Sequence, residues 1–396
     1  MKGAAGRKSG LVLSGGSADS AYAVGVVKAL SSGDSPCTGG RPLDPEILTG
    51  TSAGAYNAAL LTAEAEKAEF AQAVSRLEEA WLEQLADSLT SCGNGVFRLR
   101  GYPPEYLQPY CLLTQPFQEA SQLLSDTASL ALDTALRAVK FGAMSGPVAN
   151  RLLELVSVEP FIEATPYGES IRKTIDFSVV PQARRQVRVV ATNWTTGTLQ
   201  VFGNRELTPD FGRQEIMASG AVPGVFPPVE IGGQIFVDGL LLMNTPLSLA
   251  IKAGADDLYV IYFDPDVQDI PIPTLSSTLD SFYRVLVITF ATAINQDVEV
   301  AGIINRTILN LRRVLARSLE NEVQSVLRNI LQVKKKKTFR LLNIHLFHPR
   351  DDLGGLLGLL DFDRTRIESL IARGYQDALR HDCAASNCVL ARDGRQ

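Results

Sequence analysis

Histidine, tryptophan and cysteine are scarce in this chain of 396 residues, which has three, two and five of them respectively. The histidines are His345, His348 and His381, so all of them come late in the sequence. His345 and His348 alternate with apolar residues at an expected strand end, which favours packing or surface roles over a metal pair. The cysteines are odd in number and lack metal-site spacing, which predicts free thiols in a reducing cytoplasm and no bound metal. They are Cys37, Cys92, Cys111, Cys383 and Cys388.

Long hydrophobic runs are also missing. The longest, residues 285–294, is far shorter than the roughly 18 residues that suggest a membrane span. The first expected strand begins near Ser9, which leaves no visible signal peptide. The net charge of −5 gives no reason to propose nucleic acid as a partner. These absences predict a cytoplasmic protein. The hydrophobic residues make up 45% of the chain, which is enough for a sizeable core.

Small residues surround one serine in the run Gly50-Thr51-Ser52-Ala53-Gly54. Residues 45–49 before it are typical of a short strand, and residues 55–65 after it are typical of a helix. A nucleophile elbow has this strand, tight turn and helix, and Gly50 and Gly54 permit a sharp turn. The start of the helix favours negative charge developing at Ser52. A helix-capping serine between two turn glycines is the alternative.

A second strand–loop–helix unit opens the chain. Residues 9–13 are typical of a strand, residues 14–20 of a small, glycine-rich loop, and residues 21–30 of a helix. Such a loop can hold a phosphate or an oxyanion. No Gly-Lys-Ser/Thr follows, which argues against a nucleotide P-loop, and the later glycines of a dinucleotide fingerprint are missing. A plain tight turn is the alternative.

A carboxylate that can serve as a base is found at Asp238-Gly239. It follows the apolar run 235–237 and precedes Asn244-Thr245-Pro246. A carboxylate near a nucleophile can accept its proton. A surface Asp-Gly turn is the alternative.

Six segments, in order, resemble the patatin-like phospholipases. Residues 10–30 are similar to the glycine-rich opening of that family, residues 47–59 to its nucleophile elbow, and residues 236–246 to its Asp-Gly block. The others are residues 189–202, 218–229 and 360–378. The resemblance implies an α/β, three-layer fold with a mostly parallel central sheet and helices on both faces.

The same resemblance implies a lipid acyl hydrolase of the phospholipase A or lysophospholipase type that needs no cofactor. Ser52 would be the nucleophile and Asp238, supported by Gly239, its base. The backbone amides of Gly15, Gly16 and Ser17 would stabilise the oxyanion. A Ser-His-Asp triad stays open, since a late histidine also fits that order. Acyl transfer through the same acyl-enzyme, or a catalytically lapsed lipid-binding protein, are the alternative functions.

The glycine loop departs from the family pattern at three positions. Ser17 and Ser20 replace glycines, and Asp19 replaces a basic residue. Ser17 would be strained if its backbone were left-handed. The charge of Asp19 is expected to disfavour anionic phospholipids near the loop. We therefore expect a slower or differently selective enzyme.

The chain is expected to form a catalytic core over residues 9–270, a helical excursion over 271–337, and a last strand and closing helix over 338–382. One long acidic helix is expected over 62–88. The excursion carries basic residues that either form a solvated face or meet anionic lipid, which would make the protein a peripheral membrane protein. They include Arg312, Arg313, Lys334, Lys335, Lys336 and Lys337.

Overall fold

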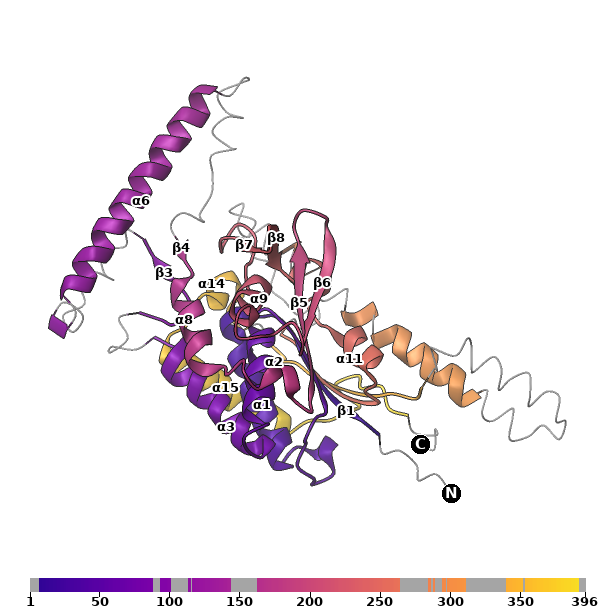
Figure 1. Cartoon of the computed structure of the whole chain (residues 1–396). Coiled ribbons are helices and arrows are strands. Elements are labelled where there is room, and N and C mark those ends of the chain that lie inside the picture. Colours follow the sequence, from indigo (N-terminus) through magenta and orange to yellow (C-terminus); the bar gives the residue numbers. More distant parts are fainter. Residues whose placement is uncertain are drawn as a thin grey trace, which may run out of the picture.

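The computed structural model places a twisted sheet between helices, with one long helix standing away from the body (Figure 1). It describes residues 7–87, 93–100, 113–114, 116–143, 162–263, 284–285, 288, 294–296, 298–310, 340–351 and 353–391. The expected basic residues Arg312, Arg313 and Lys334 to Lys337 lie outside the described residues, as do most positions of the expected excursion.

The central sheet has eight strands in the order β10-β9-β1-β2-β5-β8-β7, with β6 paired to β5. Strands β10, β9, β1, β2 and β5 run parallel, whereas β6, β7 and β8 enter by antiparallel pairs. The strands are β1 Ser9–Leu13, β2 Ile47–Thr51, β5 Gln186–Asn193, β6 Thr198–Gly203, β7 Val229–Ile231, β8 Gln234–Asp238, β9 Asp257–Ile261 and β10 Asn343–Phe347. A separate hairpin pairs β3 Arg98–Leu99 with β4 Ile162–Glu163.

Alternating residues of the strands enter two hydrophobic cores, one on each face of the sheet. In β1, Leu11 and Leu13 belong to the larger core, while Val12 belongs to the smaller one. A strand buried on both faces needs such a continuous apolar run, which is typical of parallel sheets covered by helices. The three-layer α/β fold with a mostly parallel sheet is therefore confirmed.

Helices cover both faces of the sheet. The larger core is closed by α1, α2, α3 and α15, and the smaller core by α11 and residues 298–310. The longer helices are α1 Ala21–Ser32, α2 Ala53–Glu64, α3 Phe70–Ala80, α6 Pro116–Ala143, α8 Thr165–Thr174, α9 Gly212–Ser219 and α15 Arg364–Leu379. The shorter helices are α10 Leu240–Met243, α11 Leu247–Ala253 and α14 Gly355–Leu359. Single turns occur at η1 Ser17–Ser20, η2 Pro36–Thr38, η3 Trp81–Leu85 and η5 Val180–Gln182.

The expected long helix over residues 62–88 is wrong, because the chain breaks between α2 and α3. Helix α2 ends at Glu64, and α3 begins at Phe70 with an apolar face of its own. That face packs against both α1 and α2, a position that one straight helix continuing from α2 does not reach. The acidic side chains of the run indicate a solvated face but carry no signal for the break.

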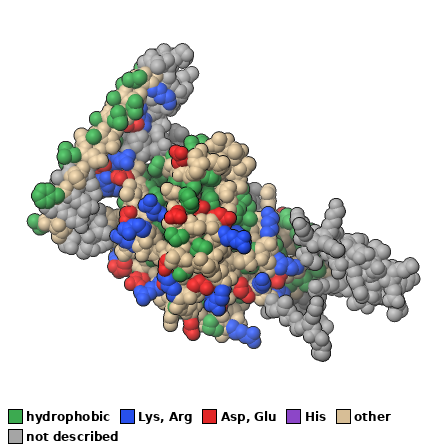
Figure 2. Space-filling model, in the orientation of Figure 1, with side chains coloured by type: hydrophobic (Ala, Val, Ile, Leu, Met, Phe, Trp, Pro, Cys, Tyr) green, Lys and Arg blue, Asp and Glu red, His purple; other side chains and the backbone are tan. Residues whose placement is uncertain are grey.

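Helix α6 carries its apolar side chains outward. Phe117 is 90% exposed, Leu124 72% and Val139 71%, and Figure 2 shows hydrophobic side chains along the outer side of this helix. Its inward side is charged instead: Asp126 is buried and ion-paired to Arg98 of β3. Among the described helices, none combines the length and the apolar character needed to cross a bilayer.

Helices α1 and α15 cross at two glycines. A Cβ atom on Gly25 would lie 1.9 Å from the carbonyl oxygen of Ile371, and one on Gly374 would lie 2.0 Å from that of Tyr22. These contacts are backbone to backbone, so no side-chain rotation relieves them. The two glycines therefore allow the closing helix to approach the helix that follows β1.

We expect Gly374→Ala to lower the free energy of unfolding by about 1–3 kcal/mol, since overpacking a tight contact forces the backbone apart. Gly302→Ala is the matched control: it lies in the helix 298–310, and its added Cβ would meet nothing closer than 3.9 Å. The control should be neutral or slightly stabilising, because alanine is the better helix former. Urea denaturation measures both, and equal stabilities would contradict this account of the crossing.

Candidate active site

Strands β2 and β8 run toward each other along one edge of β5. Both β2 and β6 pair with residues 188–190 of β5, and both β8 and β6 pair with residues 191–193. Because a strand has only two edges, β2 and β8 must share the edge opposite β6. Their last residues, Thr51 and Asp238, lie opposite the consecutive residues Val190 and Ala191. This register brings Ser52, the residue after β2, next to Asp238.

Ser52 occupies the tight turn between β2 and α2 with a backbone φ of +55°. This left-handed conformation is rare for a serine and is typical of strained functional turns. Gly50 and Gly54 have negative φ and serve close approach instead: added Cβ atoms would lie 2.1 Å from the Gly54 carbonyl oxygen and 2.3 Å from that of Leu13, respectively. The geometry is that of the elbow the sequence predicts, but the strain lies on the serine itself.

A buried serine that the sequence analysis did not single out holds this turn. The Ser52 amide donates to Ser219 Oγ at 2.9 Å, and Ser219 Oγ donates to the Val190 carbonyl oxygen at 2.6 Å. Ser219 is fully buried at the end of α9. It thereby links the elbow to the residue of β5 opposite Thr51.

Asp238 is fully buried, and burial raises the pKa of its carboxyl group to about 7. Oδ1 accepts a hydrogen bond from the Leu240 amide at 2.9 Å, which opposes that shift. The nearby Ser52 hydroxyl also lowers the pKa of Asp238. The other carboxylate oxygen, Asp238 Oδ2, has no well-formed hydrogen bond to any described residue. Catalytic hydrogen bonds are often long before substrate binds. Gly239 fits closely behind the carboxylate, since a Cβ there would lie 2.5 Å from the Val190 carbonyl oxygen.

The glycine loop is tied to the segment that follows Asp238. The Gly15 amide donates to the Asn244 carbonyl oxygen at 3.3 Å, and Asn244 Nδ2 donates to the Gly15 carbonyl oxygen at 3.3 Å. The Gly15 amide is therefore already engaged, which argues against Gly15 as an oxyanion donor. Gly16 and Ser17 lie at the start of η1, and their amides have no acceptor among the described residues.

Ser17 has a φ of +47°, so the left-handed backbone considered from the sequence is present. A serine in this conformation costs roughly 1–2 kcal/mol. The expectation for Asp19 needs correction. Asp19 is buried and ion-paired with Arg366 at the start of α15, at 2.6 Å. Its charge is balanced by that guanidinium, so it is not a free negative charge beside the substrate.

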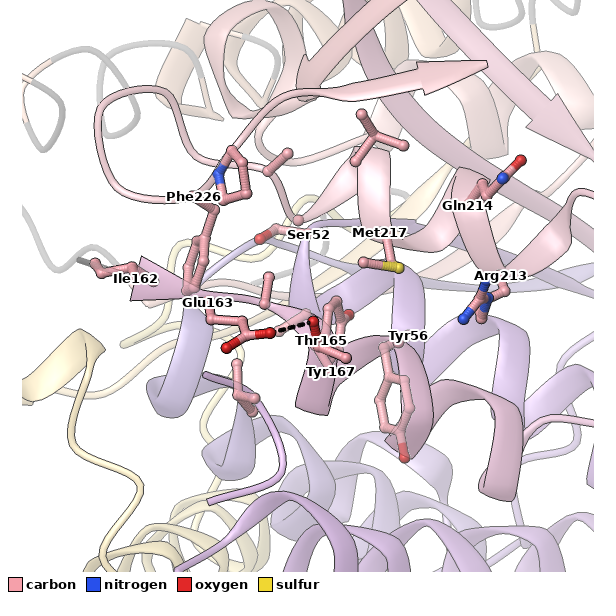
Figure 3. Close-up of a pocket in the computed structure, with 18 of the residues that line it drawn as sticks. Ser52, Tyr56, Ile162, Glu163, Thr165, Tyr167, Arg213, Gln214, Met217 and Phe226 are labelled. Atoms are coloured by element: carbon pink, nitrogen blue, oxygen red, sulfur yellow. Dashed lines mark hydrogen bonds between the residues drawn. The ribbon is translucent and has the colours of Figure 1, made fainter. Parts of the chain in front are cut away.

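A cavity of about 500 Å³ opens beside Ser52. Figure 3 shows Ser52 between Phe226 and Met217, with Tyr167 nearby and Glu163 accepting a hydrogen bond from Thr165. Most of the lining side chains are apolar or aromatic, as an acyl chain requires. All three histidines lie in the described part of the chain, and none of them lines this cavity.

The fold brings together four residues that the sequence analysis kept apart. His345 lies near His381, Cys383 and Cys388, with all four ligand atoms within 4.8 Å of one another. The residue spacing, which predicted no bound metal, therefore missed a cluster of possible metal ligands around His345. Residue spacing does not predict this cluster, because the whole of α15 lies between His345 and the other three residues.

These features define a class of protein: a three-layer α/β fold with a serine elbow beside a buried carboxylate and an apolar cavity. The model of the patatin-like phospholipase family matches residues 11–251, more than half of the chain. The chain therefore belongs to the patatin-like phospholipase family.

Two curated relatives are patatin-like phospholipase domain-containing proteins of Cryptococcus neoformans var. neoformans serotype D, from strains B-3501A and JEC21. Each is 26% identical to this chain over 256 residues, which cover 60% of this chain but 22% and 21% of the relatives. The match thus spans about a fifth of each relative's length.

Two solved structures are similar over 95% of this chain. VipD from Legionella pneumophila has a TM-score of 0.36 and 14% identity, with 67% of that chain covered. The type III effector protein ExoU has a TM-score of 0.26 and 16% identity, with 54% of that chain covered.

The raised pKa of Asp238 predicts a pH-dependent stability. Between pH 4 and 7 the folded protein keeps a proton that the unfolded chain releases, so this carboxyl group stabilises the fold most at low pH. That contribution is lost as the pH rises through about 7. Asp238→Asn removes the titration, so the variant should gain about 2–3 kcal/mol relative to the wild type between pH 5 and 8. Thermal unfolding at a series of pH values measures this, and a constant difference would contradict the shift.

Proposed function

We propose that this protein is a lipid acyl hydrolase of the phospholipase A or lysophospholipase type, with Ser52 as nucleophile and Asp238 as base. The observation that carries the proposal is the meeting of β2 and β8 on one edge of β5. This meeting point places Ser52, a strained serine that lines an apolar cavity, beside the buried carboxyl group of Asp238, whose pKa is about 7. A base with that pKa is suited to a reaction at neutral pH.

In this mechanism Ser52 Oγ attacks the ester carbonyl carbon, and Asp238 takes the hydroxyl proton. The amides of Gly16 and Ser17 stabilise the oxyanion, while the engaged amide of Gly15 keeps the loop in position. Protonated Asp238 then gives its proton to the departing alcohol. A water molecule, deprotonated by Asp238, attacks the acyl-enzyme. The C–O bond to Ser52 then breaks, Asp238 returns the proton to Ser52 Oγ, and the fatty acid is released.

We expect Ser52→Ala and Asp238→Asn each to lower kcat by at least roughly 10³-fold, since each removes a group that acts only in the chemical step. The double variant should be no slower than either single one, because residues that act as a unit are not additive. For the wild type, kcat/KM for a soluble chromogenic ester should rise with pH and level off above about 7, where Asp238 is ionised.

The control is His348→Asn, because this ring packs at a tilt against Tyr262 and neither residue lines the cavity. It and the corresponding variants of His345 and His381 should keep chemical activity. A triad would instead make one histidine essential. A wild type that fails to react with a fluorophosphonate at Ser52 would favour the lapsed lipid-binding alternative, and alcohol-dependent ester formation would favour acyl transfer.

The outward face of α6 supports a substrate held in a lipid surface. Its exposed side chains Phe117, Leu124 and Val139 carry no charge, while Asp126, Asp133 and Arg137 of the same helix are buried or half-buried; Lys140, next to Val139, is exposed. An apolar face directed to solvent is typical of a helix that lies on lipid. Through Asp126 the helix is tied to Arg98 and thence to Glu163, which lines the cavity.

Replacing Phe117, Leu124 and Val139 together by serine should lower binding to zwitterionic phospholipid vesicles by about tenfold or more, because each buried side chain contributes on the order of 1.5–3 kcal/mol. Hydrolysis of a soluble ester should not change. Val300→Ser, on another helix and 55% exposed, is the matched control. Vesicle flotation measures binding. Equal binding by both variants, or a dimer that only the wild type forms, would overturn lipid contact by this face.

A further inference from the structure

Four side chains from two distant segments converge beside the edge strand of the sheet. His345 belongs to β10, and His381, Cys383 and Cys388 follow the end of α15. His345 Nδ1 lies 3.4 Å from Cys383 Sγ. His381 Nε2 lies 3.6 Å from Cys383 Sγ and 3.5 Å from Cys388 Sγ. Two imidazoles and two thiols thus form one cluster, which lies outside the cavity beside Ser52.

These separations match the corners of a tetrahedral zinc site. With Zn–S bonds of about 2.3 Å and Zn–N bonds of about 2.0–2.1 Å, neighbouring sulfur and nitrogen ligands lie about 3.5 Å apart. Hydrogen bonds within the cluster can use only some of these contacts at one time. His381 Nε2 has a single lone pair, so it cannot accept from the thiols of Cys383 and Cys388 at the same time.

We propose that His345, His381, Cys383 and Cys388 bind one Zn²⁺ ion. Two thiolates and two neutral imidazoles are the donor set of closed structural zinc sites, and sulfur ligands with tetrahedral geometry favour zinc over magnesium or calcium. On binding, the two cysteines form Zn–S bonds and release their two protons to solvent, while the histidines bind through nitrogen lone pairs. With four protein ligands the ion has no open position, so it is structural.

The surroundings hold the donor groups in place. The Leu346 amide donates to Cys388 Sγ at 3.3 Å, the kind of contact that stabilises a bound thiolate. The His345 ring stacks on Tyr259 with centroids 5.1 Å apart, and the His381 ring stacks on Phe347 at 4.2 Å. These contacts orient both imidazoles without using their ligating nitrogens.

The proposed zinc site would fix residues 381–389, near the end of the described chain, against strand β10. Residues 381–389 lie along β10, where Ile344 and Val389 exchange backbone hydrogen bonds of 2.7 and 3.0 Å. Strand β10 is at the end of the strand order and pairs with β9 on its other side. Zinc would lock this segment over an edge that is otherwise open to pairing with another chain.

Metal analysis of the full chain, purified without chelator from zinc-supplemented cells, tests the proposal. The wild type should contain about one zinc per chain, and Cys383→Ser, Cys388→Ser and His381→Asn should each lose most of it. Cys37→Ser and His348→Asn are the matched controls, because neither residue belongs to the cluster. Both should keep about one zinc per chain. A chelator should lower the Tm of the wild type and the controls but not that of Cys388→Ser.

Cobalt titration of the metal-free wild type decides the case even if the cluster variants do not fold. Bound Co²⁺ should show the intense absorption of a tetrahedral thiolate site, and Zn²⁺ should abolish it. The absence of both zinc and this absorption would overturn the proposal. A disulfide between Cys383 and Cys388, identified by peptide mapping of the wild type, would also overturn it. So would zinc retained by all the cluster variants. Esterase activity does not enter these measurements, so their failure would leave the proposed function untouched.

Discussion

The shared edge of β5 is the constraint on which the candidate site depends. Two strands that approach from opposite directions must both stop there, and their last residues face consecutive positions of β5. The turn after β2 and the carboxylate at the end of β8 then lie next to each other, whatever the length of chain between them. A one-residue slip of either strand would turn its side chains to the other face of the sheet and separate the pair.

Close backbone contacts keep that meeting point rigid. Gly50, Gly54 and Gly239 each approach a carbonyl group at a distance that leaves no room for a Cβ. Ser219 adds a hydrogen-bonded link from the elbow to β5. The same burial that makes the fit close also removes water from Asp238 and raises its pKa to about 7. The suitability of Asp238 as a base and its cost to the stability of the fold therefore have one physical origin, the desolvation of its carboxylate.

The two edges of the central sheet differ in what lies beside them. At the β8 end, an apolar cavity opens beside Ser52, and the long helix α6 exposes apolar side chains to solvent. At the β10 end, the chain folds its last described segment back over the edge strand and gathers two histidines and two cysteines there. Helix α15 links the glycine loop to the β10 end, since Arg366 near its start balances Asp19 of that loop and the residues after its end enter the histidine–cysteine cluster.

Local pattern was enough to predict the two strand–turn–helix units at residues 9–30 and 47–64, because strand, glycine turn and helix are set by steric preferences over a few residues. Resemblance to a family added Asp238 and the three-layer fold. Local pattern did not reveal that Asn244 engages the Gly15 amide, that Arg366 neutralises Asp19, or that His345 joins His381. These pairs are far apart in sequence, so only strand register and helix packing decide whether they touch. The sequence by itself determined the kinds of chemical groups and the local turns; the tertiary structure decided their partners, and with them their charge, exposure and free donors.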